Sequence, residues 1–160
     1  MAVSMADITK LRKMTGAGMM DCKNALAESE GDFDKAMEII RKKGQAVAAK
    51  RSDRETSEGC VLAKSTGDYA AMIALKCETD FVAKNAVFQE FVQNVADKAL
   101  KASVDKAGDG EDVCAILDMQ SELEEKTLTI GEKLSIRRFQ KITGDCVASY
   151  IHGGGRIGVL

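Results

Sequence analysis

The chain has 160 residues, of which 45% are hydrophobic and 30% are charged, a balance typical of folded globular domains rather than disordered chains. Its formal net charge of −2 provides no overall field that would attract nucleic acid or an anionic membrane. No apolar run approaches the ~20 residues that span a bilayer, and the N-terminus has neither a signal-peptide nor a transit-peptide pattern. We therefore expect a cytoplasmic protein with no direct contact to nucleic acid or membrane.

The cysteines suggest neither a disulfide framework nor a zinc site. There are five of them, an odd number, and no two form a Cys-x-x-Cys pair. Free cysteine is among the most buried residue types, and thiols persist in a reducing compartment. We expect small buried thiols, with no metal and no cofactor, at Cys22, Cys60, Cys77, Cys114 and Cys146.

The first 44 residues predict three short helices separated by glycines. Asp7 can cap the first helix, and Gly16 can end it in the left-handed conformation. A second helix follows and ends at Gly31. Asp32 can then cap a third helix, which we expect to close at Gly44.

Residues 45–56 are small and basic, and we interpret them as a linker whose first half can be helical. After this linker the apolar periodicity shifts towards alternation, so residues 58–65 and 69–77 are expected to form strands. The turn sequence at Lys64–Asp68 recurs at Lys141–Asp145, again between two strand-like runs. Because glycine in such a turn supplies the positive φ of a hairpin, we expect two hairpins in one mostly antiparallel sheet.

Helices are predicted between these hairpins. Apolar residues recur at i, i+3, i+4, i+7 and i+11 over one segment and define a helical stripe, consisting of Phe88, Phe91, Val92, Val95 and Ala99. A second helix is expected near residues 121–132, and a final strand pattern at residues 156–160 stops without a terminating turn. The predicted fold class is α+β, in which helices pack on one face of an antiparallel sheet.

Two glycine-rich motifs near the C-terminus do not predict catalysis. His152–Gly155 matches an oxyanion loop of some esterases, but the Gly-x-Ser-x-Gly motif that would supply the nucleophile is absent. Gly153–Gly158 satisfies Gly-x-Gly-x-x-Gly, but no helix follows to hold a pyrophosphate. His152 is interpreted first as a hydrogen-bonded histidine at a strand end and second as a contact to a partner protein. A third interpretation makes it the base for a cysteine nucleophile.

The segment Thr79-Asp80-Phe81-Val82 lies between a predicted strand and a helical run. Thr79 is a natural N-cap, and Asp80 falls in the first helical turn, where a carboxylate is favourable. Two interpretations remain open from this pattern. In one, Phe81 and Val82 are buried in the chain's own core; in the other, Phe81 is presented beside a carboxylate to a partner.

Four longer segments resemble the elongation factor Ts family, and they occur in order along essentially the whole chain. Residues 14–26 are similar to the N-terminal signature of the family, and residues 77–84 are similar to its second signature. Residues 130–139 and 150–158 look like later landmarks of the same family. The family acts in translation elongation, in protein biosynthesis, so the resemblance implies a guanine nucleotide exchange factor rather than an enzyme.

The resemblance also implies a domain organisation. Residues 1–44 would form a ubiquitin-associated-like three-helix domain, followed by the linker at residues 45–56. Residues 57–144 would form the first half of a core domain, and residues 145–160 would begin a second half that is truncated at its C-terminus.

The expected partner is elongation factor Tu in its GDP-bound form. The resemblance implies that Thr79, Asp80, Phe81 and Val82 insert beside its nucleotide and displace the bound Mg²⁺. Further partner contacts are expected from four residues that match family positions, Arg12, Met19, Met20 and His152.

Three other functions are weighed against nucleotide exchange. The chain can be a truncated binding module with little exchange activity of its own. It can be a ubiquitin-like adaptor, suggested by the helical N-terminus alone, or a cysteine hydrolase that uses His152. The adaptor leaves the Thr79–Val82 segment unexplained.

Overall fold

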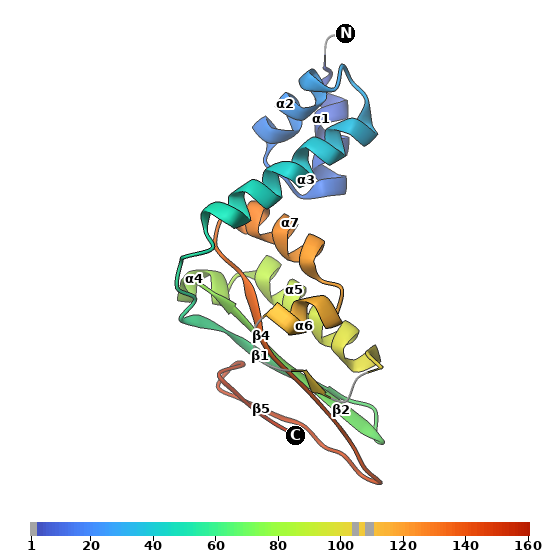
Figure 1. Cartoon of the computed structure of the whole chain (residues 1–160), viewed down its shortest axis with the longest axis vertical. Coiled ribbons are helices and arrows are strands. Elements are labelled where there is room, and N and C mark those ends of the chain that lie inside the picture. The colour runs from blue at the N-terminus through green and yellow to red at the C-terminus, as the bar shows by residue number, and fades with distance from the viewer. Residues whose placement is uncertain (1–2, 104–105, 108–110) are drawn as a thin grey trace. The chain divides into compact units, whose positions relative to one another are not determined.

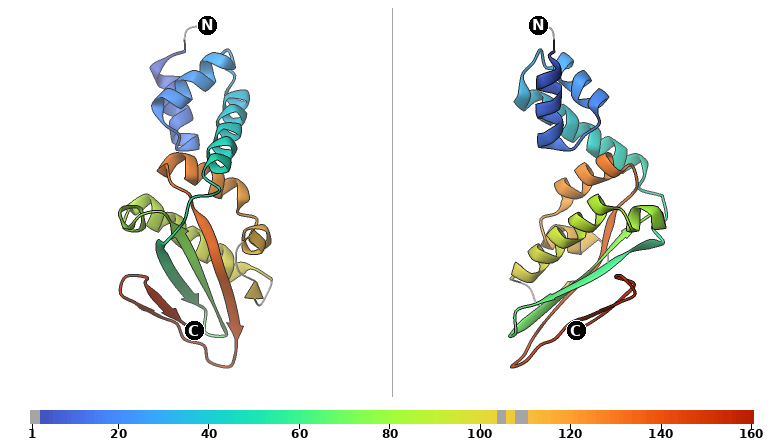
Figure 2. Two further views of the ribbon diagram at one scale, coloured as in Figure 1. Left: turned by 60° about the vertical axis from the view of Figure 1, so that its left-hand side comes forward. Right: turned by 180° about the vertical axis from the view of Figure 1, so that it is seen from behind.

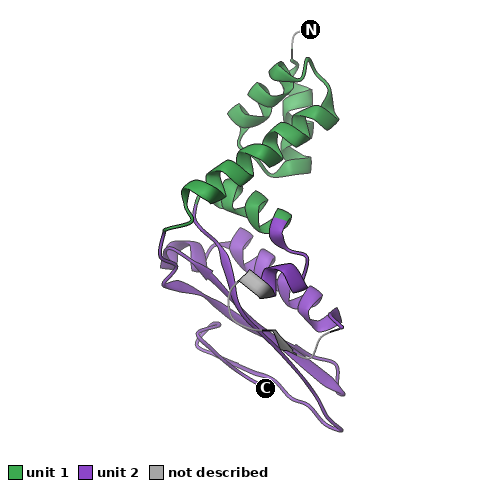
Figure 3. Cartoon of the chain, viewed as in Figure 1, with its two compact units in different colours: residues 1–53, 121–131 green, residues 54–120, 132–160 purple. Residues whose placement is uncertain are grey.

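The computed structural model describes residues 3–103, 106–107 and 111–160. The chain divides into two compact units, which Figure 3 shows in different colours. Unit 1 contains residues 1–53 and 121–131, and unit 2 contains residues 54–120 and 132–160. The chain therefore returns to the helical unit once, late in the sequence.

Unit 1 is helical. Its helices are α1 (Met5–Thr15), α2 (Met19–Glu28), α3 (Phe33–Lys50) and α7 (Gln120–Ile130) (Figure 1). The first three, which were predicted, pack around one apolar core, and Leu128 of α7 lies against that core. The core side chains are Ile8, Leu11, Ala17, Cys22, Ala25, Leu26, Ala36 and Ile40.

The first helix begins earlier than predicted. Its N-cap is Ser4, whose hydroxyl oxygen accepts a 3.1 Å hydrogen bond from the backbone N–H of Asp7. Asp7 therefore lies inside the first turn, where the helix dipole favours a carboxylate, and the prediction that it caps the helix is wrong. The predicted end is confirmed, because Gly16 adopts a left-handed φ of 68° and its N–H bonds to the Arg12 carbonyl.

The third helix does not close at Gly44 but continues to Lys50, so the predicted end is wrong. Its predicted N-cap is confirmed, since the Asp32 carboxylate accepts two backbone N–H groups of the first turn. Gly44 is buried, and a Cβ at this position would lie 3.3 Å from the backbone oxygen of Glu124 in α7. The glycine thus permits a close approach of two helices instead of ending one of them.

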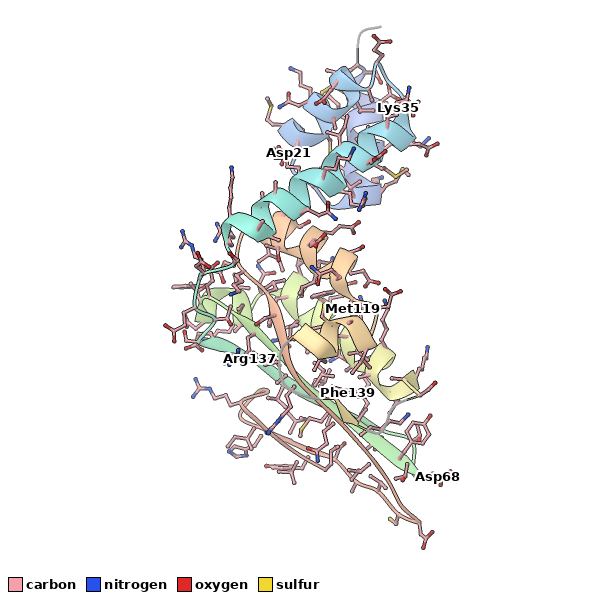
Figure 4. All side chains as sticks on the ribbon, in the orientation of Figure 1. Asp21, Lys35, Asp68, Met119, Arg137 and Phe139 are labelled. Carbon is pink, nitrogen blue, oxygen red and sulfur yellow. The ribbon has the colours of Figure 1, made fainter. Side chains whose placement is uncertain are left out.

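Unit 2 is built on a four-stranded antiparallel sheet in the order β1-β2-β4-β3. Its strands are β1 (Glu58–Ser65), β2 (Tyr69–Cys77), β3 (Lys106–Ala107) and β4 (Ser135–Thr143). The β1–β2 hairpin has the predicted bounds and turns around Asp68, which Figure 4 labels at the tip. The paired strands β2 and β4 are adjacent although about sixty residues separate them in sequence.

The second predicted hairpin, around residues 141–145, does not form. The strand β5 (Tyr150–His152) pairs instead with β6 (Ile157–Val159) in a separate two-stranded sheet. The repeated turn sequence after β4 contacts the tip of the first hairpin, where Gly144 donates a 2.9 Å hydrogen bond to the Asp68 carbonyl. A turn sequence specifies a local bend but not the partner of the strand that follows, so the prediction is wrong.

Helices cover one face of the sheet, as predicted for the α+β class. α5 (Ala86–Lys101) and α6 (Glu111–Ile116) lie on that face in the views of Figures 1 and 2. The predicted stripe of α5 is buried against alternate residues of β2, among them Ile73 and Leu75. The β5–β6 hairpin lies on the other side, along β1, where Val61 donates a 2.7 Å hydrogen bond to the Gly155 carbonyl (Figure 2).

Candidate functional site: an exposed corner between β2 and α5

The segment between β2 and α5 forms a single helical turn, α4 (Asp80–Ala83). Thr79 is its N-cap, with extended backbone angles and a hydroxyl oxygen that accepts the Val82 N–H at 3.4 Å. Asn85 then caps α5 by accepting the Val87 N–H at 2.8 Å. The predicted capping role of Thr79 is confirmed. Together the two caps turn the chain sharply from strand to helix.

Phe81 projects from this corner into solvent. Its side chain is 83% exposed, and none of the four residues of α4 is buried. With its ring this exposed, Phe81 contributes little apolar burial to its own chain. The interpretation in which Phe81 and Val82 are both buried in the core is therefore wrong, because Phe81 is exposed and Val82 is only partly buried.

A carboxylate and an ammonium group lie beside this ring in the same short segment. Lys84 Nζ is 2.8 Å from Asp80 Oδ2, one helical turn away. The hydrogen bond from Lys84, reinforced by its charge, lowers the pKa of the Asp80 carboxyl below its ordinary value. Asp80 is therefore an exposed, ionised group at neutral pH.

Two carboxylates join this corner to the loop that precedes β4. Glu132 Oε2 accepts the backbone N–H groups of Glu78 and Thr79, both at 3.0 Å, and its Oε1 accepts the Thr79 hydroxyl at 2.6 Å. In the opposite direction, Glu78 Oε1 accepts the backbone N–H of Lys133 at 2.6 Å. We call this pair of carboxylates, Glu78 and Glu132, the carboxylate clasp. The sequence does not predict this clasp, since nothing local in it links residues more than fifty positions apart.

The other predicted contact residues belong to other elements of the chain. Arg12 on α1 and the two methionines Met19 and Met20 on α2 belong to unit 1, and all three are exposed. Exposed methionine side chains are adaptable apolar contacts, and Met20 is 62% exposed. His152 ends β5 in unit 2.

His152 is an exposed, hydrogen-bonded histidine at a strand end, as first predicted. Its Nδ1 lies 2.9 Å from the Tyr150 hydroxyl. The two ring centroids lie 5.9 Å apart, and the ring planes are tilted by 40°. This partner is a tyrosine rather than a thiol, so the geometry does not support a cysteine–histidine nucleophile.

The cysteines only partly match expectation. Cys22, Cys60, Cys77 and Cys114 are buried, but Cys146 is exposed, so the prediction for Cys146 is wrong. Burial, with the nearby charges of Glu132 and Glu58, raises the pKa of the Cys77 thiol to about 11.

Within the described residues, no cluster of three or more His, Cys, Asp or Glu side chains is arranged to hold a metal ion. No described helix is long and apolar enough to cross a bilayer.

The chain thus combines a small helical unit with an α+β unit that presents an exposed aromatic side chain on a capped corner. The family model for elongation factor Ts matches residues 78–160, just over half of the chain. The chain therefore belongs to the elongation factor Ts family.

Curated relatives agree with this assignment over nearly the whole chain. Elongation factor Ts of Bacteroides thetaiotaomicron is 58% identical over 156 residues, which cover 95% of this chain and 46% of the relative. Elongation factor Ts of Porphyromonas gingivalis is 51% identical over 165 residues, covering 100% of this chain and 59% of the relative. That of Christiangramia forsetii is 49% identical, covering 99% and 58%. The chain thus spans about half the length of the curated relatives it matches.

Proposed function

We propose that this chain binds elongation factor Tu in its GDP-bound form and accelerates release of GDP. The observation that supports this most directly is the 83% exposure of Phe81 on a turn that Thr79 caps and that the Asn85 cap of α5 directly follows. An exposed aromatic side chain on a rigid turn loses little conformational entropy when it inserts into a partner. Aromatic side chains are also common among the few residues that dominate binding energy.

The corner is suited to disturbing a nucleotide-bound metal ion. Mg²⁺ requires near-ideal octahedral geometry and bridges the phosphates to the protein in GTPases. In the proposed complex, Phe81 moves the elements around the partner's Mg²⁺, while ionised Asp80 disturbs charge and hydrogen bonding there. Thr79 and Val82 fix the backbone from which both side chains project.

Exchange in this scheme is a coupling between two binding equilibria. If the chain weakens GDP binding by some factor, GDP weakens binding of the chain by the same factor. No bond is made or broken, so the proposed function requires no catalytic residue. Arg12, Met19, Met20 and His152 are proposed as additional contacts that contribute affinity, since all four are exposed.

The test is release of a fluorescent GDP from elongation factor Tu, measured with and without the chain. We expect the wild-type chain to accelerate release and Phe81→Ala to reduce the acceleration by roughly tenfold or more, as for an aromatic residue that dominates an interface. The matched control is Ile116→Ala, because Ile116 is also an exposed apolar side chain of unit 2 but lies on α6. Equal acceleration by wild type and Phe81→Ala would remove Phe81 from the mechanism.

The same measurement separates exchange from binding alone. The chain spans 46% and 59% of two of these relatives, and the remaining length of those proteins can contribute contacts of its own. Binding of elongation factor Tu with unchanged GDP release would identify a binding module without exchange activity.

A further inference from the structure

Hydrogen bonds contribute to the orientation of the Phe81 corner, because α4 is only partly packed: Val82 and Ala83 are half-buried, and Phe81 is exposed. No residue of α4 is buried, and the turn contains only four residues. A helix this short is not stable by itself, since nucleation is costly and few backbone bonds are formed. Side-chain groups that satisfy its first N–H groups therefore help to determine where its side chains point.

Glu132 acts on the first turn of α4 through the Thr79 hydroxyl. A hydroxyl group has one hydrogen to donate and lone pairs to accept with. Thr79 donates its hydrogen to Glu132 Oε1 at 2.6 Å and accepts the Val82 N–H at 3.4 Å. The carboxylate thus holds the hydroxyl in the rotation that leaves a lone pair facing α4.

The clasp lies where the sheet no longer fixes the chain. The last pair between β2 and β4 is Lys76 with Ser135, and β2 ends one residue later at Cys77, which pairs with Glu58 of β1. Glu78 and Glu132 bridge the segment that follows β2 and the segment that precedes β4. Arg54 adds a guanidinium group 3.5 Å from Glu78 Oε2. Hydrogen bonds to charged groups are stronger than neutral ones, so the bridge extends the rigidity of the sheet to the corner.

We infer that Glu132 is a positioning residue for nucleotide exchange: its carboxylate holds the Thr79–Val82 turn so that Phe81 points outward from a fixed backbone. Glu132 acts through Thr79 and requires no contact of its own with the partner. This inference rests on the proposed function for its biological consequence, but its structural part can be tested on the isolated chain.

The first test is amide hydrogen exchange on the chain alone. In Glu132→Ala, we expect the amides of Glu78 and Thr79 to lose protection roughly tenfold or more, because each loses a hydrogen bond to a charged acceptor. The buried helix residue Val92 serves as the internal reference and should be unchanged. The matched control is Glu90→Ala, which removes an exposed carboxylate from α5.

A conservative substitution of Glu132 separates its bonds to the backbone N–H groups from its bond to the Thr79 hydroxyl. In Glu132→Gln, the remaining carbonyl oxygen can still accept both backbone N–H groups, while the amide nitrogen cannot accept the Thr79 hydroxyl proton. We expect Glu78 and Thr79 to keep most of their protection and the Val82 amide to lose its own. An equal loss at Val92 in either variant would show a general loss of stability and would overturn the inference.

The second test is a double-mutant cycle in the GDP-release assay. If Glu132 acts by positioning Phe81, Glu132→Ala should reduce the acceleration severalfold in the wild-type background and have little further effect in Phe81→Ala. Losses that multiply independently would overturn the positioning role even if the amide results agree. If wild type does not accelerate release, the proposed function fails, and the amide exchange data alone decide whether Glu132 holds the corner.

Discussion

Lys84 Nζ lies 2.8 Å from Asp80 Oδ2, so the exposed carboxylate beside Phe81 carries its own counter-ion within the same turn. The two residues are four positions apart, the spacing at which acidic and basic side chains meet on a helix. Removing Lys84 therefore tests how the ion pair affects the pKa of Asp80.

The substitution Lys84→Ala should raise the pKa of Asp80 towards its ordinary value, because the hydrogen bond and charge that lower the pKa are removed. A carboxyl whose pKa is lowered on folding contributes stability above its unfolded pKa, and this contribution disappears as pH falls through the folded value. An NMR titration of the carboxyl carbons measures the shift. The control is the Glu38–Lys42 pair, which has the same spacing and a similarly lowered Glu38 pKa. An unchanged Asp80 pKa would contradict the ion pair.

The same substitution at two phenylalanines should have different consequences for stability. Phe88 is fully buried, so Phe88→Ala should lower the free energy of unfolding by about 3–5 kcal/mol. Phe81 is 83% exposed, so Phe81→Ala should change it by no more than about 0.5 kcal/mol. Urea denaturation measures both. Comparable losses at the two positions would mean that Phe81 packs against its own chain.

Gly155 should tolerate alanine poorly. A Cβ there would overlap Cys60 Sγ and lie 3.0 Å from the Val61 carbonyl oxygen, at a positive φ of 93°. We expect Gly155→Ala to lower the free energy of unfolding by about 1–3 kcal/mol, the range for overpacking. Gly154→Ala is the matched control, because Gly154 also has a positive φ but a Cβ added to it would meet no atom within 4 Å. Equal free energies of unfolding for the two variants would show that the β5–β6 hairpin does not lie close to β1.

Thiol reactivity should distinguish one cysteine from the others. Cys146 is the exposed cysteine among the five, while burial raises the pKa of both Cys60 and Cys77 and lowers their thiolate fractions. At about pH 8, near the ordinary pKa of a thiol, iodoacetamide should therefore modify Cys146 first in the native chain and all five cysteines in urea. Mass spectrometry of peptides reports the order. Modification of Cys77 as fast as Cys146 would contradict its burial.

Regular spacing made several elements predictable. The stripe from Phe88 to Ala99 identifies α5, and alternation identifies β1 and β2 with their observed bounds. The predictions failed where one residue type can serve two purposes. Gly44 fits the pattern of a helix terminator, whereas its missing side chain permits contact with α7. The repeated turn before Asp145 fits the pattern of a hairpin, whereas that turn packs against the first hairpin.

The sequence by itself determined the family, the fold class and the capped turn that begins at Thr79, because these depend on short motifs and regular spacing. Tertiary structure alone decided that Phe81 is exposed, since a Thr-Asp-Phe-Val segment is equally compatible with a buried ring. It also brought Glu132 to Thr79 across fifty-three positions of sequence. The physical reason is that hydrogen bonds between loops distant in sequence depend on which strands pair, and the pairing of strands as far apart as β2 and β4 is not encoded by any local pattern.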